Sequence, residues 1–228
     1  MISNKNITHI HKAIKEFNKL VDKTFLIAFT PSKSQPLQFM EIQIKQNNFW
    51  HLVGCQIDKN LGLDDDEKEE LYKNCFKGDD VSKFLKYTRK PNKPMAFFNS
   101  KDIPIKSLVV LNIFNFIDNA KKIRIVDAKG TGDAHIYEIG IGSGIEKAII
   151  GYRFENNYYV PITSLEKSIF NVDKNANNKI VIILSKESKH QQYDKIEYEV
   201  GKGLFRKLVL QFKDKFPLSN NLMNNLKE

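Results

Sequence analysis

The second half of the chain is a series of short segments rich in β-branched and aromatic residues, and this pattern restricts the fold more than any other feature. Gly, Asn and Asp turns separate the segments, which read KIRIVD, HIYEIG, KAIIGYRF, NYYVPITSL, NKIVIILSK and KIEYEVG. Residues of these types favour strands, and strands joined by short turns pair antiparallel. Residues 121–200 are therefore expected to form mainly an antiparallel sheet.

Residues 1–120 are expected to be mainly helical. Helical spacing of apolar residues covers 7–21, and an acidic run at 63–76 places carboxylates where the N-terminus of a helix favours them. A third helix, buried, is predicted over 104–120, with its apolar stripe at Ile105, Leu108, Val109, Ile113 and Phe116. Strands at 24–30 and 37–45 form a hairpin. Helices and a hairpin that precede an antiparallel sheet indicate the α+β class, and we expect residues 1–228 to form a single domain.

The charge balance and the cysteines limit the possible partners. The net charge of +9 favours a polyanionic partner such as a nucleic acid, or else only keeps the protein soluble. Cys55 and Cys75 are too few for a disulfide framework or a four-cysteine zinc site. No apolar run approaches the length of a membrane span. We therefore expect a cytoplasmic protein with no membrane partner, no metal site and no cofactor.

The glycine-rich stretch EIGIGSG, Glu138–Gly144, resembles a nucleotide-cofactor loop. Such a loop must open a helix and be followed by an acidic residue at the end of the next strand. Here the next residues alternate like a strand and run into a turn at 155–157, and too little chain follows for a doubly wound domain. The stretch is therefore predicted to be a glycine turn that leads into a strand.

A basic segment at 79–90 is predicted to be a helix that begins at Asp79 or Asp80 and ends before Pro91. Cations interleaved with an aromatic residue suit a phosphate backbone and a stacked base, although a solvated helix face has the same composition. The residues predicted to bind RNA are Lys83, Lys86, Tyr87, Arg89 and Lys90.

His51 stands out among the five histidines because it lies in the aromatic-rich stretch FWHLVG. Asn47 or Asn48 is placed to begin a short helix there. A histidine in this setting is either a core residue bonded to a backbone carbonyl or a functional residue, and its neighbours alone do not distinguish the two.

Several motifs together resemble a family of phage and mobile-element nucleases, the fourth group of phage Barnase–EndoU–colicin–RelE-like (BECR) nucleases. The first motif is Phe49-x-His51-Leu52-x-Gly54, at the end of a predicted strand. The later motifs are Ala148, Ile149, Ile150 and Gly151, then Tyr158, Tyr159, Pro161, Ile162 and Thr163, and finally Leu184, Ser185 and Lys186. The resemblance spans most of residues 7–200.

This resemblance implies a BECR-like α+β fold and metal-independent ribonuclease activity. It implies a toxin or phage-defence effector of a mobile element that cleaves tRNA or mRNA by attack of the ribose 2′-OH. An antitoxin or immunity protein is then a possible partner. A non-catalytic module that binds nucleic acid or protein on the same fold, and a metal-dependent nuclease, are the alternative hypotheses.

Cleavage of RNA without a metal ion needs a base, an acid and fixed donors around the phosphorane. His51 is the candidate base or acid, and Lys186 and Arg153 are candidates to neutralise the phosphate. Tyr159, Thr163 and Ser164 are candidates to donate hydrogen bonds or to stack on a base.

Overall fold

The computed structural model describes residues 2–30, 35–90, 93–114, 117–118, 120–174 and 176–224. The helices are α1 (Asn4–Asn18), α2 (Asn48–Leu52), α3 (Asp65–Lys77), α4 (Asp102–Phe114), α5 (Leu204–Lys213) and α6 (Asn220–Asn224). Within this part of the chain, no helix combines the length and the apolar character that crossing a bilayer requires.

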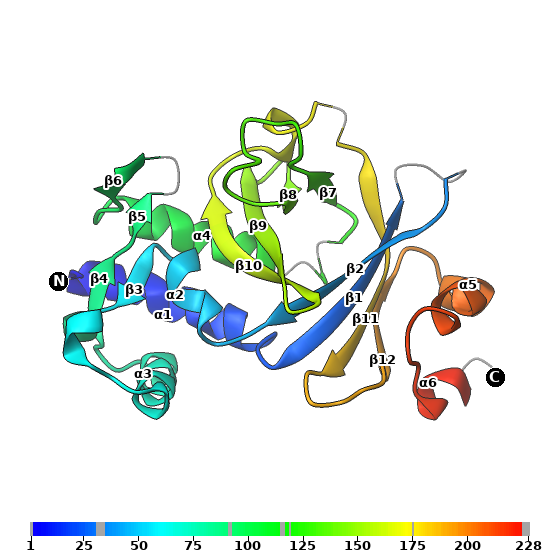
Figure 1. The fold of residues 1–228 in the computed structure, drawn as a ribbon, viewed down its shortest axis with the longest axis horizontal. Coiled ribbons are helices and arrows are strands. Elements are labelled where there is room, and N and C mark those ends of the chain that lie inside the picture. The colour runs from blue at the N-terminus through cyan, green and yellow to red at the C-terminus, as the bar shows by residue number, and fades with distance from the viewer. Residues whose placement is uncertain are drawn as a thin grey trace.

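One sheet dominates the fold, and it is closed on itself (Figure 1). Its strands are β1 (Lys23–Thr30), β2 (Gln38–Ile44), β7 (Ile123–Asp127), β8 (Ile139–Ser143), β9 (Ala148–Glu155), β10 (Tyr158–Leu165), β11 (Asn178–Glu187) and β12 (Lys195–Glu199). They lie in the order β1-β2-β10-β9-β8-β7-β11-β12, and β1 also pairs with β11. The sheet therefore resembles a barrel, with β12 added beside β11.

The predicted α+β class agrees with this mixture of helices and sheet, and the strands within 121–200 pair antiparallel as predicted, but the complete sheet is not antiparallel throughout. β2 and β10 run parallel, with Ile42 opposite Tyr159, so the sheet is mixed as well as closed. The predicted hairpin is present as β1 and β2, but it is part of the main sheet and supplies the edge through which the sheet closes.

Two short ribbons lie outside the main sheet. β3 (Cys55–Ile57) pairs with β4 (Leu85–Tyr87), and β5 (Arg89–Lys90) pairs with β6 (Lys93–Phe97). The prediction of a helix over 79–90 is thus wrong. The segment forms a single 3-10 turn, Ser82–Phe84, and then two strands. The tertiary reason is that β3 offers an edge for Leu85–Tyr87, and this pairing replaces helical hydrogen bonds.

The two faces of the strands pack against different helices. Phe25 and Ile27 of β1 share the main hydrophobic core with Ile14 and Phe17 of α1. Leu26, on the opposite face of β1, belongs to a second cluster whose members also include Ala28, Leu184, Phe205 and Phe212. In Figure 1, α1–α4 accordingly gather at one end of the molecule, whereas α5 and α6 cover the sheet at the other end.

α3 and α4 confirm the helices predicted from the acidic run at 63–76 and over 104–120. However, α4 buries a different face from the one predicted. Asp64 caps α3, and its carboxylate and that of Glu67 form a reciprocal capping box. In α4, Val109 is buried as predicted, but Ile105 is 39% exposed and Leu108 is 56% exposed. The Ile113 side chain and Phe116, also placed on this stripe, lie outside the described residues. The helix is rotated so that Lys106 and Ser107 face inward instead.

The glycine-rich stretch is also different from its prediction, because most of it is strand β8 and not a turn. Neither Gly140 nor Gly142 has a positive φ. A Cβ on Gly142 would lie 2.6 Å from the backbone oxygen of Ala148, and a Cβ on Gly140 would lie 3.0 Å from the Tyr137 ring. These glycines therefore serve close packing inside the curved sheet and not chain reversal.

We expect Gly142→Ala to lower the free energy of unfolding by about 1–3 kcal/mol, because the added methyl group would overlap a backbone atom that cannot move freely. Gly132→Ala is the matched control, since its Cβ would meet no atom within 4 Å. Denaturant unfolding of both variants measures the difference. Equal stabilities would contradict this account of β8.

Candidate functional site

Helix α2 presents His51 on its exposed side. Phe49, Trp50 and Leu52 are buried and hold the helix against the core. As predicted, the helix begins at the asparagine pair, although Asn47 makes no side-chain cap; instead the Asn48 Oδ1 accepts a hydrogen bond from the Lys45 N–H at 2.9 Å. The helix ends where the N–H of Gly54, at φ +81°, donates to the His51 carbonyl. His51 is therefore held by a short, well-anchored element.

His51 lines a cavity of about 510 Å³, which we call the arginine cavity. Arg89 of β5, Arg153 of β9 and Thr163 of β10 line the same cavity. The Arg153 Nη2 donates to the Ile136 carbonyl at 3.3 Å, which orients the guanidinium. Glu155 is the acidic residue of the cavity. Three of the residues placed in the site from the sequence, far apart along the chain, thus meet here: His51, Arg153 and Thr163.

The other residues proposed for catalysis lie elsewhere. Tyr159 makes an edge contact with the Phe154 ring, at 5.2 Å between ring centroids, and lines a different cavity, together with Asp127 and Glu138. Ser164 is buried, and its hydroxyl donates to the Leu52 carbonyl at 2.5 Å, so it ties β10 to the end of α2.

Lys186 lies on the face of β11 that carries the second cluster. Its Nζ donates to the Gln191 carbonyl at 3.1 Å and sits 4.6 Å from the centroid of the Tyr193 ring. It does not line the arginine cavity. Lys186 is therefore not among the residues that the arginine cavity brings together with His51, and its role in catalysis stays a prediction.

The residues predicted to bind RNA are largely engaged within the protein. Lys86 pairs with Asp58 at 2.8 Å, and Lys90 pairs with Asp102 at 3.2 Å. Lys83 lies 4.9 Å above the Phe84 ring, and Tyr87 is partly buried against the main core. Of the five residues, Arg89 alone lines the arginine cavity.

Lys106 of α4 is the residue near the site that the sequence reasoning missed. It is 5% exposed, and its Nζ donates to the Ser164 carbonyl at 2.7 Å and to the Ser164 Oγ at 3.1 Å. The ammonium also lies 4.4 Å from the centroid of the Phe98 ring, and Phe98 lines the arginine cavity. The available signal was a lone lysine inside the apolar run IPIKSLVVL, because lysine is rarely buried without a purpose.

Burial shifts the titration of both residues in the same direction. Desolvation lowers the pKa of Lys106 to about 7, against an ordinary value of 10.5. The pKa of His51 is lowered below 6.5, first because neighbouring protein desolvates the ring, then by the charges of Lys106 and Lys59. His51 keeps an exposed edge, so it is open to solvent and still mainly neutral at neutral pH. A neutral imidazole can accept a proton.

The site therefore combines a proton acceptor, two guanidinium groups and a hydroxyl in one cavity. Guanidinium groups bind phosphate oxygens in a planar, two-point geometry. Among the described residues, no three His, Cys, Asp or Glu side chains come together as metal ligands would. The arrangement suits proton transfer next to a bound phosphodiester.

Comparison with known proteins identifies the family. A family model described as phage-Barnase-EndoU-ColicinE5/D-RelE like nuclease 4 matches residues 9–202. Neither a curated protein nor a solved structure matches the chain significantly. Helices α5 and α6 begin after the matched residues end.

The buried lysine predicts how stability depends on pH. Since the pKa of Lys106 falls from 10.5 in the unfolded chain to about 7 in the fold, the unfolded chain binds more protons between these values. Stability therefore rises with pH, by up to about 2 kcal/mol between about pH 7 and pH 9. Denaturant unfolding should show this rise in the wild type but not in Lys106→Met. Parallel profiles for the two proteins would contradict the assignment.

The same substitution tests the electrostatics of His51. Lys106 is protonated below about pH 7, so it carries its charge in the range where His51 titrates. Lys106→Met should raise the pKa of His51, but not to 6.5, because burial is the larger cause of the shift. The other charged groups nearby are Lys59, Arg89, Arg153 and Glu155, and these do not change.

NMR titration of the imidazole resonances measures this shift. The resonances of His190, an exposed residue in the β11–β12 connection, should be the same in both proteins. An unchanged titration of His51 would show that Lys106 does not influence it.

Proposed function

The chain belongs to the phage-Barnase-EndoU-ColicinE5/D-RelE like nucleases, group 4, and from this premise we propose that it is an endoribonuclease that works without a metal ion. Membership in the family indicates an enzyme that cleaves nucleic acid. The single observation that supports this chemistry is the meeting of His51, Arg153, Arg89 and Thr163 in one cavity.

In the proposed reaction, neutral His51 takes the proton of a ribose 2′-OH. The 2′ oxygen then forms a bond to phosphorus while the bond from phosphorus to the 5′ oxygen breaks. The leaving oxygen takes up a proton from solvent, and the products are a 2′,3′-cyclic phosphate and a 5′-OH. A base that is neutral at the working pH typically contributes about 100-fold or more to such a reaction.

The arginines act on the charge that develops at phosphorus. Arg153 is held by the Ile136 carbonyl, so its guanidinium is placed before the substrate binds. Donors that are already oriented stabilise a phosphorane without reorganisation. Arg89 and Thr163 line the same cavity, where they offer a second cation and a neutral hydroxyl donor. DNA lacks the 2′-OH, so this reaction is specific for RNA.

We extend the proposal to a biological role as a toxin or phage-defence effector that cleaves tRNA or mRNA. The phage origin in the family description and the net charge of +9 support this role. An antitoxin or immunity protein that blocks such a site would carry acidic groups facing Arg89 and Arg153, because these two cations dominate the arginine cavity.

The test is incubation of purified protein with total RNA in the presence of EDTA. We expect cleavage with cyclic phosphate ends, and a loss of about 100-fold or more in rate for His51→Ala. His190→Ala is the matched control, because it removes an exposed histidine from the β11–β12 connection without touching the arginine cavity.

Each alternative has its own outcome. Cleavage that EDTA abolishes would support a metal-dependent nuclease. Salt-sensitive binding of RNA without cleavage would support a non-catalytic module. Full activity in His51→Ala would place the reaction elsewhere.

A further inference from the structure

A second cavity, of about 470 Å³, adjoins the arginine cavity at His51. His51 and Asn47 line both cavities, so the imidazole stands on the boundary between them. Trp50, Ile57 and Leu63 supply apolar walls. Both volumes fall within the range of sites for small ligands, roughly 300–1,000 Å³.

One positive charge in the second cavity is free for a ligand. Lys68 pairs with Asp65 at 2.8 Å, and Asp58 is paired with Lys86. Lys59, on the 3-10 turn Lys59–Leu61, is exposed, and within the described residues no carboxylate pairs with its ammonium. Lys59 and His51 line the same cavity, so the two side chains face one space.

The amide of Gln56 lines the same cavity, and β3 presents it beside the Lys59 turn. An amide side chain can donate and accept hydrogen bonds at once, which is what reading the edge of a base requires. The second cavity thus offers a cation, an amide and apolar walls, the three kinds of group that bind a phosphate, a base edge and a base face.

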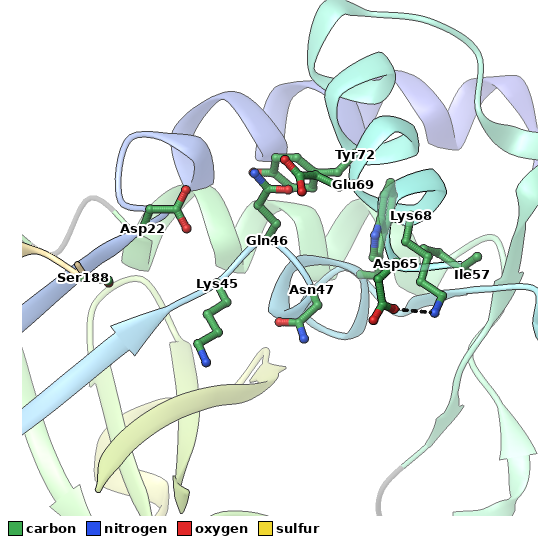
Figure 2. Close-up of a pocket in the computed structure, with 11 residues that line it drawn as sticks. Asp22, Lys45, Gln46, Asn47, Ile57, Asp65, Lys68, Glu69, Tyr72 and Ser188 are labelled. Atoms are coloured by element: carbon green, nitrogen blue, oxygen red, sulfur yellow. Dashed lines mark hydrogen bonds and ion pairs between the residues drawn. The ribbon is translucent and has the colours of Figure 1, made fainter. Parts of the chain in front are cut away.

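The groove continues beyond the second cavity. A third cavity, of about 440 Å³, shares Asn47, Trp50, Ile57 and Lys68 with it. Figure 2 shows Lys45 and Asn47 extending from the same side of the segment that joins β2 to α2, and it shows the ion pair of Asp65 with Lys68, of which Lys68 lines both cavities. The second and third cavities therefore adjoin along these shared residues.

We propose that the second cavity is a nucleotide-binding subsite, in which Lys59 binds a phosphate and Gln56 contacts the base of a nucleotide that lies outside the arginine cavity. The inference rests on the proposed function and deepens it. A substrate that occupies both cavities crosses His51 with nucleotides on each side, so the scissile phosphate is internal to the chain.

Binding of a non-cleavable RNA tests the subsite separately from the reaction. The probe is a fluorescent 2′-O-methyl oligoribonucleotide pool of roughly eight nucleotides, a length within the usual range for a single-strand site. Lys59→Ala should weaken binding about tenfold, as the loss of one charge-assisted hydrogen bond does, and Gln56→Ala should weaken it to a smaller extent. Lys207→Ala, which removes an exposed lysine from α5 at the opposite end of the molecule, should leave binding unchanged (Figure 1).

The kinetics of cleavage give a second measurement, made on an RNA whose cleavage site has been mapped. Lys59→Ala should raise KM for the long RNA more than it raises KM for an RNA shortened on the side that the second cavity holds. Lys59→Arg, which keeps the charge, should restore binding.

The outcomes separate the two proposals. If the wild type neither binds nor cleaves RNA, both fail. If it cleaves RNA but Lys59→Ala and Gln56→Ala behave like Lys207→Ala, the subsite is wrong and the proposed function stands. If Lys59→Ala and Gln56→Ala bind RNA normally but lose affinity for an acidic peptide, the cavity binds a protein partner and the subsite is wrong.

Discussion

The pairing of β1 with β11 is the constraint on which the rest of the structure depends. Lys23 at the start of β1 lies opposite Glu187 at the end of β11, and the two strands remain paired along the length of β1. This contact joins the N-terminal hairpin to the last long strand and closes the sheet. Closure leaves β2 next to β10, and these two strands run parallel.

The parallel pairing brings the candidate site together. Since β2 and β10 point the same way, the chain that leaves β2 continues beside the second half of β10. α2 follows β2 directly, and the Ser164 hydroxyl of β10 reaches the Leu52 carbonyl of α2. His51 therefore lies near Thr163, and Arg153 joins them because β9 is the antiparallel neighbour of β10. An antiparallel arrangement of β2 and β10 would direct α2 to the opposite end of the strand.

Lys106 of α4 connects β10 and α2 through hydrogen bonds. Its ammonium donates twice to Ser164, which in turn donates to Leu52, so α4, β10 and α2 meet at one buried polar node. A buried ammonium costs stability, since it is desolvated in the fold and not in the unfolded chain. The charge of this ammonium also lowers the pKa of His51 and so favours the neutral imidazole. The cost to stability and the contribution of Lys106 to the lowered pKa of His51 thus have one physical origin, which is the burial of this charge near the arginine cavity.

The sequence by itself determined the secondary structure with strong local signals and the family. The capping box of α3, the short helix of His51 and most of the strands follow from side-chain preferences over a few residues. The motif around His51 indicated the nuclease family, which the comparison over residues 9–202 then identified. Only the tertiary structure decided the closure of the sheet, the strand at 85–87, the role of Gly142, the burial of Lys106 and the separation of Lys186 from His51. These features depend on pairing between segments far apart in the chain, and local periodicity carries no information about which strand edge or which face a distant segment will occupy.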